Sequence, residues 1–167
     1  LPWADEEAEA YFSEDTDTMS IGICSLGDRA YREYLKELGL TYDEAKDKAI
    51  LFNSFSLYDE QTGQSRAHRI FRMSAGDVFS GSIYDLTAGG EDSGREDASL
   101  TLAAVTDTET LGISGTQAVL IVSDEWMDAH ANAVFDSATA YYDCEDADAL
   151  QEVMTDEYGI PVDHITN

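Results

Sequence analysis

Lysine and arginine are scarce in this sequence of 167 residues: nine stand against 35 aspartates and glutamates, a formal net charge of -26. Proteins that bind nucleic acid neutralise phosphates with basic side chains, so this composition excludes nucleic acid as a partner. It also disfavours docking onto anionic lipid through a polybasic patch. A cationic peptide or a divalent cation is compatible with the charge. An acidic surface that only maintains solubility is the simpler explanation.

Long hydrophobic runs are also missing. The longest apolar stretches, such as residues 118–122, have the length of a strand, whereas a membrane-spanning helix needs about 20 residues. The 43% of hydrophobic residues is enough to form the core of one domain or of two small lobes. The chain starts at Leu1 and carries no signal-peptide pattern. We therefore expect a soluble segment cut from a longer protein.

Cysteine is nearly absent as well. Cys24 and Cys144 are the two cysteines, so a zinc site of four cysteines is excluded and one intramolecular pairing is conceivable. An oxidising location would permit a disulfide between them. Two buried free thiols are the alternative, and the sequence leaves both open.

Apolar periodicity predicts alternating strands and helices. A short helix is expected within residues 1–12, and the clearest helix begins at Asp28 as its N-terminal cap and ends at Gly39. Ser123 is expected to cap a short helix, and a last helix carries Leu150 and ends at Gly159. Strands are predicted at residues 19–24, 49–53, 55–58, 66–72, 78–84, 100–105, 118–122 and 139–142, and a loop at residues 88–97.

This order of elements predicts an α+β fold. Residues 1–54 and 112–167 would form an α/β lobe, and residues 55–111 an inserted β-rich subdomain. A partner surface would then lie on the insertion, at about residues 55–105. Aromatic residues are numerous, and core packing explains most of them. Tyr58, Phe79 and Tyr84 are the candidates for partner contact, because they lie near predicted strand ends or turns.

Catalytic patterns are lacking. The three histidines, His68, His130 and His164, lie in separate elements and form no metal-binding pair. No nucleophile elbow and no phosphate-binding glycine loop occur. Acidic clusters at residues 14–17 and 143–148 could supply calcium ligands, but neither completes an EF-hand loop. We expect a protein that is not an enzyme and uses no cofactor or metal, and calcium binding stays open.

Five segments, in their order and spacing, resemble one protein family. They are residues 32–43, 49–59, 74–78, 103–113 and 118–128, which include the sequences Glu37-Leu38-Gly39-Leu40 and Ile121-Val122-Ser123-Asp124. Over about residues 19–165 the chain resembles the extracellular domain of FtsX-like (MacB-type) ABC transporter permeases of Gram-positive bacteria. The strand expected before the N-terminal helix of such domains has no counterpart here.

The resemblance implies a fold, a location and partners. The fold would be a ferredoxin-like βαβ lobe with a small antiparallel insertion, similar to the MacB periplasmic core. The domain would lie between the first two of four transmembrane helices, on the extracellular side of the cell membrane. Its partners would be the remainder of the permease, in a dimeric transporter, and a separate ATPase subunit. Its role would be ligand binding or mechanical coupling in export, or in resistance to or sensing of antimicrobial peptides.

Two other classes of protein remain open at this stage. A secreted or surface-anchored binding or adhesion module would share the soluble acidic composition, and would be recognised by a signal peptide and a wall anchor. A small extracellular hydrolase would need a nucleophile and a base within hydrogen-bond reach.

Overall fold

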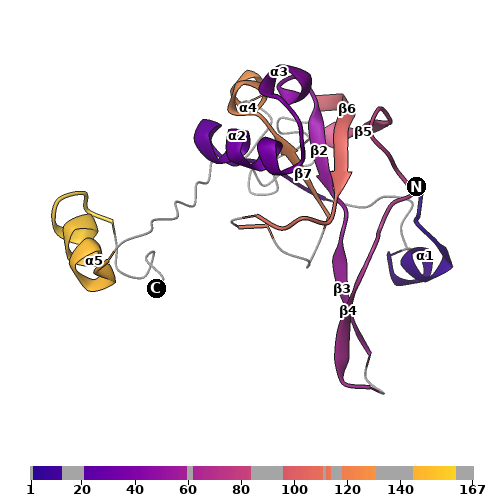
Figure 1. The fold of residues 1–167 in the computed structure, drawn as a ribbon, viewed down its shortest axis with the longest axis horizontal. Helices are drawn as coiled ribbons and strands as arrows, with labels where there is room; N and C mark the ends of the chain where they lie inside the picture. The colour runs from indigo at the N-terminus through magenta and orange to yellow at the C-terminus, as the bar shows by residue number, and fades with distance from the viewer. Residues whose placement is uncertain are drawn as a thin grey trace. The chain divides into compact units, whose positions relative to one another are not determined.

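A computed structural model describes residues 2–12, 21–59, 62–83, 96–110, 112–113, 118–130 and 145–160. The chain forms two compact units, Leu1–Ser137 and Ala138–Asn167. The described residues combine helices with a curled mixed sheet, as Figure 1 shows, so the α+β class predicted from the sequence is confirmed. No helix within these described ranges is long and apolar enough to cross a bilayer.

Five strands of the first unit form one mixed sheet. Their order is β1 (Gly22–Ser25), β7 (Val119–Val122), β2 (Ala49–Phe52), β6 (Glu96–Thr106) and β5 (Val78–Ile83). β1 is parallel to β7, and β2 is parallel to β6. β7 and β2 are antiparallel, as are β6 and β5. Strands distant in sequence are therefore neighbours in the sheet.

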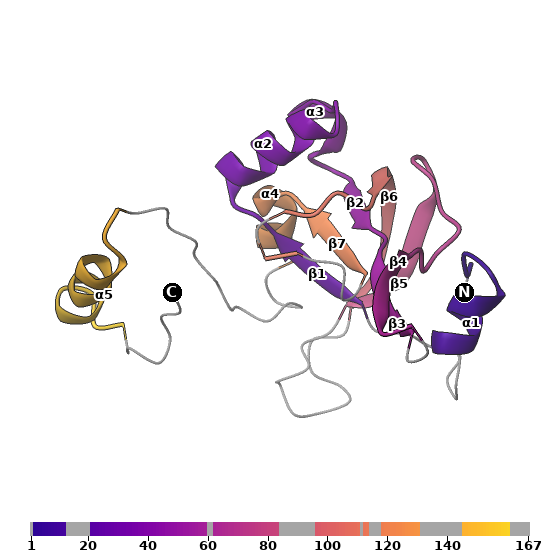
Figure 2. The ribbon, with the colours of Figure 1, turned by 60° about the horizontal axis from the view of Figure 1, so that its bottom comes forward.

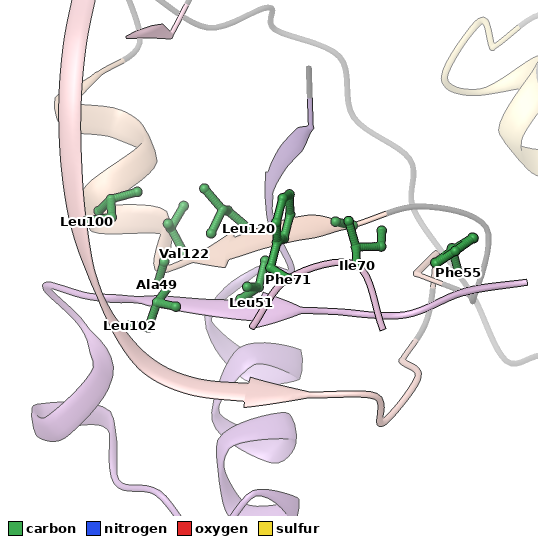
Figure 3. Close-up of a cluster of buried hydrophobic side chains, with 10 residues drawn as sticks. Ala49, Leu51, Phe55, Ile70, Phe71, Leu100, Leu102, Leu120 and Val122 are labelled. Atoms are coloured by element: carbon green, nitrogen blue, oxygen red, sulfur yellow. The ribbon is translucent and has the colours of Figure 1, made fainter. Parts of the chain in front are cut away.

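The central strands are buried on both faces, which explains their uninterrupted apolar sequences. Ile50 and Phe52 of β2 pack with the buried face of helix α2 (Asp28–Glu37). Ala49 and Leu51 point to the other face, into the cluster drawn in Figure 3. β7 alternates in the same way between the two clusters. The strands predicted at residues 49–53 and 118–122 are confirmed.

Helix α2 ends as the sequence predicts. Gly39 has a left-handed backbone, with φ 72. The Leu40 N–H donates to the carbonyl of Leu35 at 2.8 Å, and the Gly39 N–H donates to the carbonyl of Lys36 at 3.1 Å. These two bonds form a Schellman motif, which satisfies carbonyls that the helix end leaves without partners.

The start of α2 differs from the prediction. Asp28 is the first helical residue, and the capping position belongs to Gly27, at φ 77. The Asp28 carboxylate instead accepts from the guanidinium of Arg32, one turn further on, at 2.9 Å. The predicted cap at Asp28 was wrong because an opposite charge four residues away competes for its side chain.

Two short helices complete this unit's core. α3 (Tyr42–Ala45) follows α2, and α4 (Asp124–Ala129) follows β7. Ser123 caps α4 as predicted, because its Oγ accepts from the Trp126 N–H at 3.1 Å. The same hydroxyl donates to the carbonyl of Lys46 at 2.7 Å, which ties the start of α4 to the segment before β2.

Two strand boundaries differ from the prediction. β6 begins at Glu96, within the predicted loop, because its first residues pair with β5, where Glu96 faces Ile83. β4 covers Gln64–His68, so the predicted strand at residues 66–72 was placed too late. Residues 70 and 71 instead bond to the Asn53 side chain. Long-range pairing decided both boundaries, and local periodicity does not contain it.

The predicted division into two lobes stays a prediction. β5 and β6, from the predicted insertion of residues 55–111, belong to the same sheet as β1, β2 and β7. β3 (Phe55–Asp59) and β4, from the same range, form a separate two-stranded sheet.

The second unit contains helix α5 (Ala147–Asp156). Its N-terminal cap is Asp146, whose carboxylate accepts from the Ala149 N–H at 3.0 Å. Gly159 follows the helix at φ 67, as the sequence predicts. The strand predicted at residues 139–142 lies outside the described residues.

Candidate functional site

The hairpin of β3 and β4 is the candidate site. It follows β2 directly and extends away from the five-stranded sheet (Figure 1). Phe55 faces His68 at its base, and Asp59 faces Gln64 at its far end. The Tyr58 side chain is 65% exposed. A two-stranded hairpin is only marginally stable by itself, so this element depends on what holds its base.

Asn53 holds the base of the hairpin. This side chain is 2% exposed and lies between the end of β2 and the start of β3. Its Oδ1 accepts from the backbone N–H groups of Ile70 at 3.2 Å and Phe71 at 2.9 Å, and its Nδ2 donates to the carbonyl of Phe71 at 2.7 Å. One amide therefore joins the chain entering the hairpin to the chain leaving it.

Aromatic rings support the same base. The Trp3 ring forms stacked pairs with the rings of Phe12 and Phe71, with ring centroids 5.9 and 5.8 Å apart. Phe55 meets the Phe12 ring edge-on at 4.8 Å and the His68 ring at 5.4 Å. Such aromatic pairs stabilise beyond the apolar area that they bury. The N-terminal segment is thus part of the support of the hairpin.

Backbone hydrogen bonds fix the N-terminal segment in place. The Ala4 N–H donates to the carbonyl of Ile70 at 2.9 Å, and the Arg72 N–H donates to the carbonyl of Pro2 at 2.7 Å. Helix α1 (Glu6–Phe12) follows these bonds and lies beside the hairpin in both Figure 1 and Figure 2.

Charged groups connect α1 to β4. Asp5 caps α1, since its Oδ1 accepts from the N–H groups of Glu7 at 3.1 Å and Ala8 at 3.0 Å. The same oxygen lies 3.1 Å from Nε2 of His68. The Ala8 N–H, and after it the His68 side chain, hold the pKa of Asp5 below its usual range. Glu7 forms an ion pair with Arg66 of β4.

Replacing Asp5 with asparagine is expected to weaken the attachment of α1 in a pH-dependent way. The folded pKa of Asp5 is lowered, so its carboxylate stabilises the fold above the unfolded pKa of about 4, and this contribution is lost as the pH falls through the folded value. Urea unfolding from about pH 6 to about pH 2 measures it. The difference between wild type and Asp5→Asn should be largest at the higher pH and should vanish in acid.

Glu9→Gln is the matched control, because it removes an exposed carboxylate from the same helix. It should leave the pH profile unchanged. A difference between wild type and Asp5→Asn that is constant across the pH range would contradict the role of the Asp5 charge.

The structure places the predicted contact residues on different elements. Tyr58 lies on the hairpin, whereas Phe79 lies on β5 of the five-stranded sheet. The Phe79 ring is partly buried and meets the Phe71 ring edge-on at 5.7 Å. Tyr84 lies outside the described residues. Of the two described residues, Tyr58 is exposed, as contact with a partner requires, and Phe79 is half-buried.

Of the two cysteines in the predicted disulfide, the structure describes only Cys24. Cys24 lies on β1 and is half-buried, and burial raises the pKa of its thiol to about 11. Cys144 lies outside the described residues, so the disulfide stays a prediction.

The two described histidines contact carboxylates, a backbone carbonyl and aromatic rings. His68 contacts the carboxylates of Asp5 and Glu7. His130 Nδ1 lies 2.8 Å from the carbonyl of Trp126, and its ring is stacked on the indole. Within the described ranges, no three His, Cys, Asp or Glu side chains form a group that could hold a metal ion. Most residues of the two acidic clusters, and His164, lie outside those ranges.

Sequence reasoning did not identify Asn53 or Asp5 as residues that position the hairpin. An Asn between two apolar strands resembles an ordinary turn residue, and Asp5 is one acidic residue among many. A polar residue directly after a fully apolar strand is the one local signal that could have indicated the buried amide.

In comparisons with family models, with curated proteins and with solved structures, no match to this chain was found.

Proposed function

We propose that the chain is a non-catalytic extracytoplasmic domain of an FtsX-like (MacB-type) ABC transporter permease. The order and spacing of the segments that resemble this family support the proposal, and the α+β class of the described residues agrees with it at the level of fold class. The domain would lie on the extracellular side of the membrane. Its partners would be the rest of a dimeric permease and a separate ATPase subunit.

The observation that carries the proposal is the supported hairpin. Its base is bonded to Asn53, whose backbone N–H also donates to the carbonyl of Thr106, the last residue of β6, at 2.8 Å. A force on the hairpin would therefore act directly on the strands of the main sheet. An extension that is exposed at Tyr58 and rigid at its base suits contact with a partner and mechanical coupling.

The full-length gene provides the first test. We expect one apolar segment of about 20 residues before residue 1 and three more after residue 167, together with a gene for an ATPase subunit. A signal peptide with a wall anchor would overturn the proposal in favour of a secreted or surface-anchored binding module.

Labelling of intact cells tests the location. A Tyr58→Cys variant of the full-length protein should react with a membrane-impermeant maleimide added outside the cells, because residue 58 is exposed. The unsubstituted protein is the control for labelling of Cys24 and Cys144. Labelling of the variant above this control only after lysis would place the domain in the cytoplasm and overturn the proposal.

A further inference from the structure

β5 is the last strand at one end of the five-stranded sheet. Among the described residues it pairs with β6 alone, so no described strand pairs with its other side. It is six residues long, and its side chains are exposed or half-buried. β1, at the opposite end of the sheet, has four residues, all half-buried.

The hydrogen-bond pattern shows which backbone groups of β5 point outward. The Leu102 N–H donates to the carbonyl of Asp77 at 2.8 Å, and bonded and non-bonded pairs alternate along an antiparallel ladder. Val78 and Ser80 therefore occupy non-bonded positions, and their N–H and C=O groups point away from β6. The Ser80 and Ser99 hydroxyls lie 2.9 Å apart, which fits the close side chains of a non-bonded pair.

Within its six described residues, β5 lacks three features that protect exposed edges. Edge strands are commonly guarded by charged side chains, by proline or by a bulge within the strand. The sequence of β5, Val-Phe-Ser-Gly-Ser-Ile, contains no charged residue and no proline, and its register with β6 is continuous from Val78 to Ile83. Such an edge is a template for the addition of another strand.

The surrounding charge indicates what could bind there. No lysine or arginine occurs in β5 or β6, nor anywhere after Arg95 in the sequence. Asp77 precedes β5, and Glu96 and Asp97 begin β6. A second copy of this chain would bring another charge of -26 to the contact, which opposes self-association through this edge. A basic segment would be attracted.

We propose that the outer edge of β5 binds an extended cationic peptide segment as an additional strand. The N–H and C=O groups of Val78 and Ser80 pair with the peptide backbone, and the acidic surroundings attract its basic side chains. The Val78 side chain, 55% exposed, gives an apolar contact on one face. Such a peptide would be the ligand of the extracytoplasmic domain proposed above, and its biological meaning rests on that proposed function.

Peptide binding to the protein tests this edge. The probe is a labelled peptide of about ten residues that alternates lysine and valine, and the control peptide has the same charge with proline in place of valine. Fluorescence anisotropy at low and at physiological salt gives the two dissociation constants. We expect the alternating peptide to bind at least about tenfold more tightly than the proline peptide at both salt concentrations. Equal affinities would mean capture by charge alone and would overturn the proposal.

Ser80→Pro is the decisive variant. It removes one outward N–H and leaves the bonds between β5 and β6 in place, and proline is tolerated at such edge positions. Affinity for the alternating peptide should fall about tenfold. Ser80→Ala keeps the N–H and removes only the hydroxyl, so it should bind like wild type. Unchanged binding by a folded Ser80→Pro variant would overturn the proposal.

Amide hydrogen exchange gives a second readout if Ser80→Pro does not fold. In wild type, the peptide should protect the amides of Val78 and Ser80 and leave that of Phe79, which points to β6, unchanged. Protection elsewhere without protection of these two amides would overturn the proposal. The search of the full-length gene for membrane-spanning segments has an outcome that does not depend on peptide binding. Failure of the proposed peptide site at β5 and failure of the proposed permease function are therefore distinguishable.

Discussion

Asn53→Ala is expected to lower the free energy of unfolding by about 3–5 kcal/mol. The Asn53 amide satisfies three backbone groups, the N–H of Ile70 and the N–H and C=O of Phe71. Each buried group left without a partner costs about 1–3 kcal/mol. The change also leaves a small void at a position that is 2% exposed. Urea unfolding followed by far-UV circular dichroism measures the effect.

Two further variants distinguish the loss of the Asn53 hydrogen bonds from the effect of substitution in general. Asn53→Asp keeps the acceptor for the two N–H groups but, when ionised, cannot donate to the carbonyl of Phe71, so it should also be strongly destabilised. Ser80→Ala, at an exposed site of β5, should stay within about 0.5 kcal/mol of wild type. A loss below about 1 kcal/mol for Asn53→Ala would contradict the role of the amide.

Phe71→Ala is expected to cost about 3–5 kcal/mol and to release the N-terminal segment from the hairpin base. The Phe71 side chain is 1% exposed, and its ring contacts Trp3 on one side and Phe79 on another. Without it, the indole of Trp3 loses a stacking partner and gains contact with water. Urea unfolding gives the stability, and a red shift of the Trp3 emission reports the release.

The emission experiment needs one background change. Trp126 is the other tryptophan, so both proteins should carry Trp126→Phe. Phe71→Leu retains most of the buried volume and should cost less than Phe71→Ala, about 1–1.5 kcal/mol. An unshifted emission in a folded Phe71→Ala variant would show that the N-terminal segment is held without this ring.

Local sequence patterns predicted the strands and helix ends that depend on residues close together in the sequence. The uninterrupted apolar runs of β2 and β7 indicated strands, and the structure confirms both. Gly39 and Ser123 indicated a helix end and a helix start, because a left-handed backbone and a capping hydroxyl depend on nearby residues alone. The cap predicted at Asp28 was wrong because its carboxylate pairs with Arg32, which is also nearby in the sequence.

The candidate site was less predictable. Tyr58 was identified correctly as a residue near a strand end, and the structure gives it an exposed place on the hairpin. The partners of Asn53 lie 17 and 18 residues further along the chain, and His68 lies 63 residues from Asp5. No local pattern contains these pairings, so the residues that hold the hairpin could not be found from spacing.

The sequence by itself determined the charge of this protein, including the absence of lysine and arginine after Arg95, and the apolar periodicity of its main strands and helices. These are properties of composition and of neighbouring residues. Only the tertiary structure decided the strand order β1-β7-β2-β6-β5, the separate hairpin and the exposed edge of β5. Strand pairing is stabilised by contacts between segments far apart in the chain, and those contacts exist only once the chain has folded.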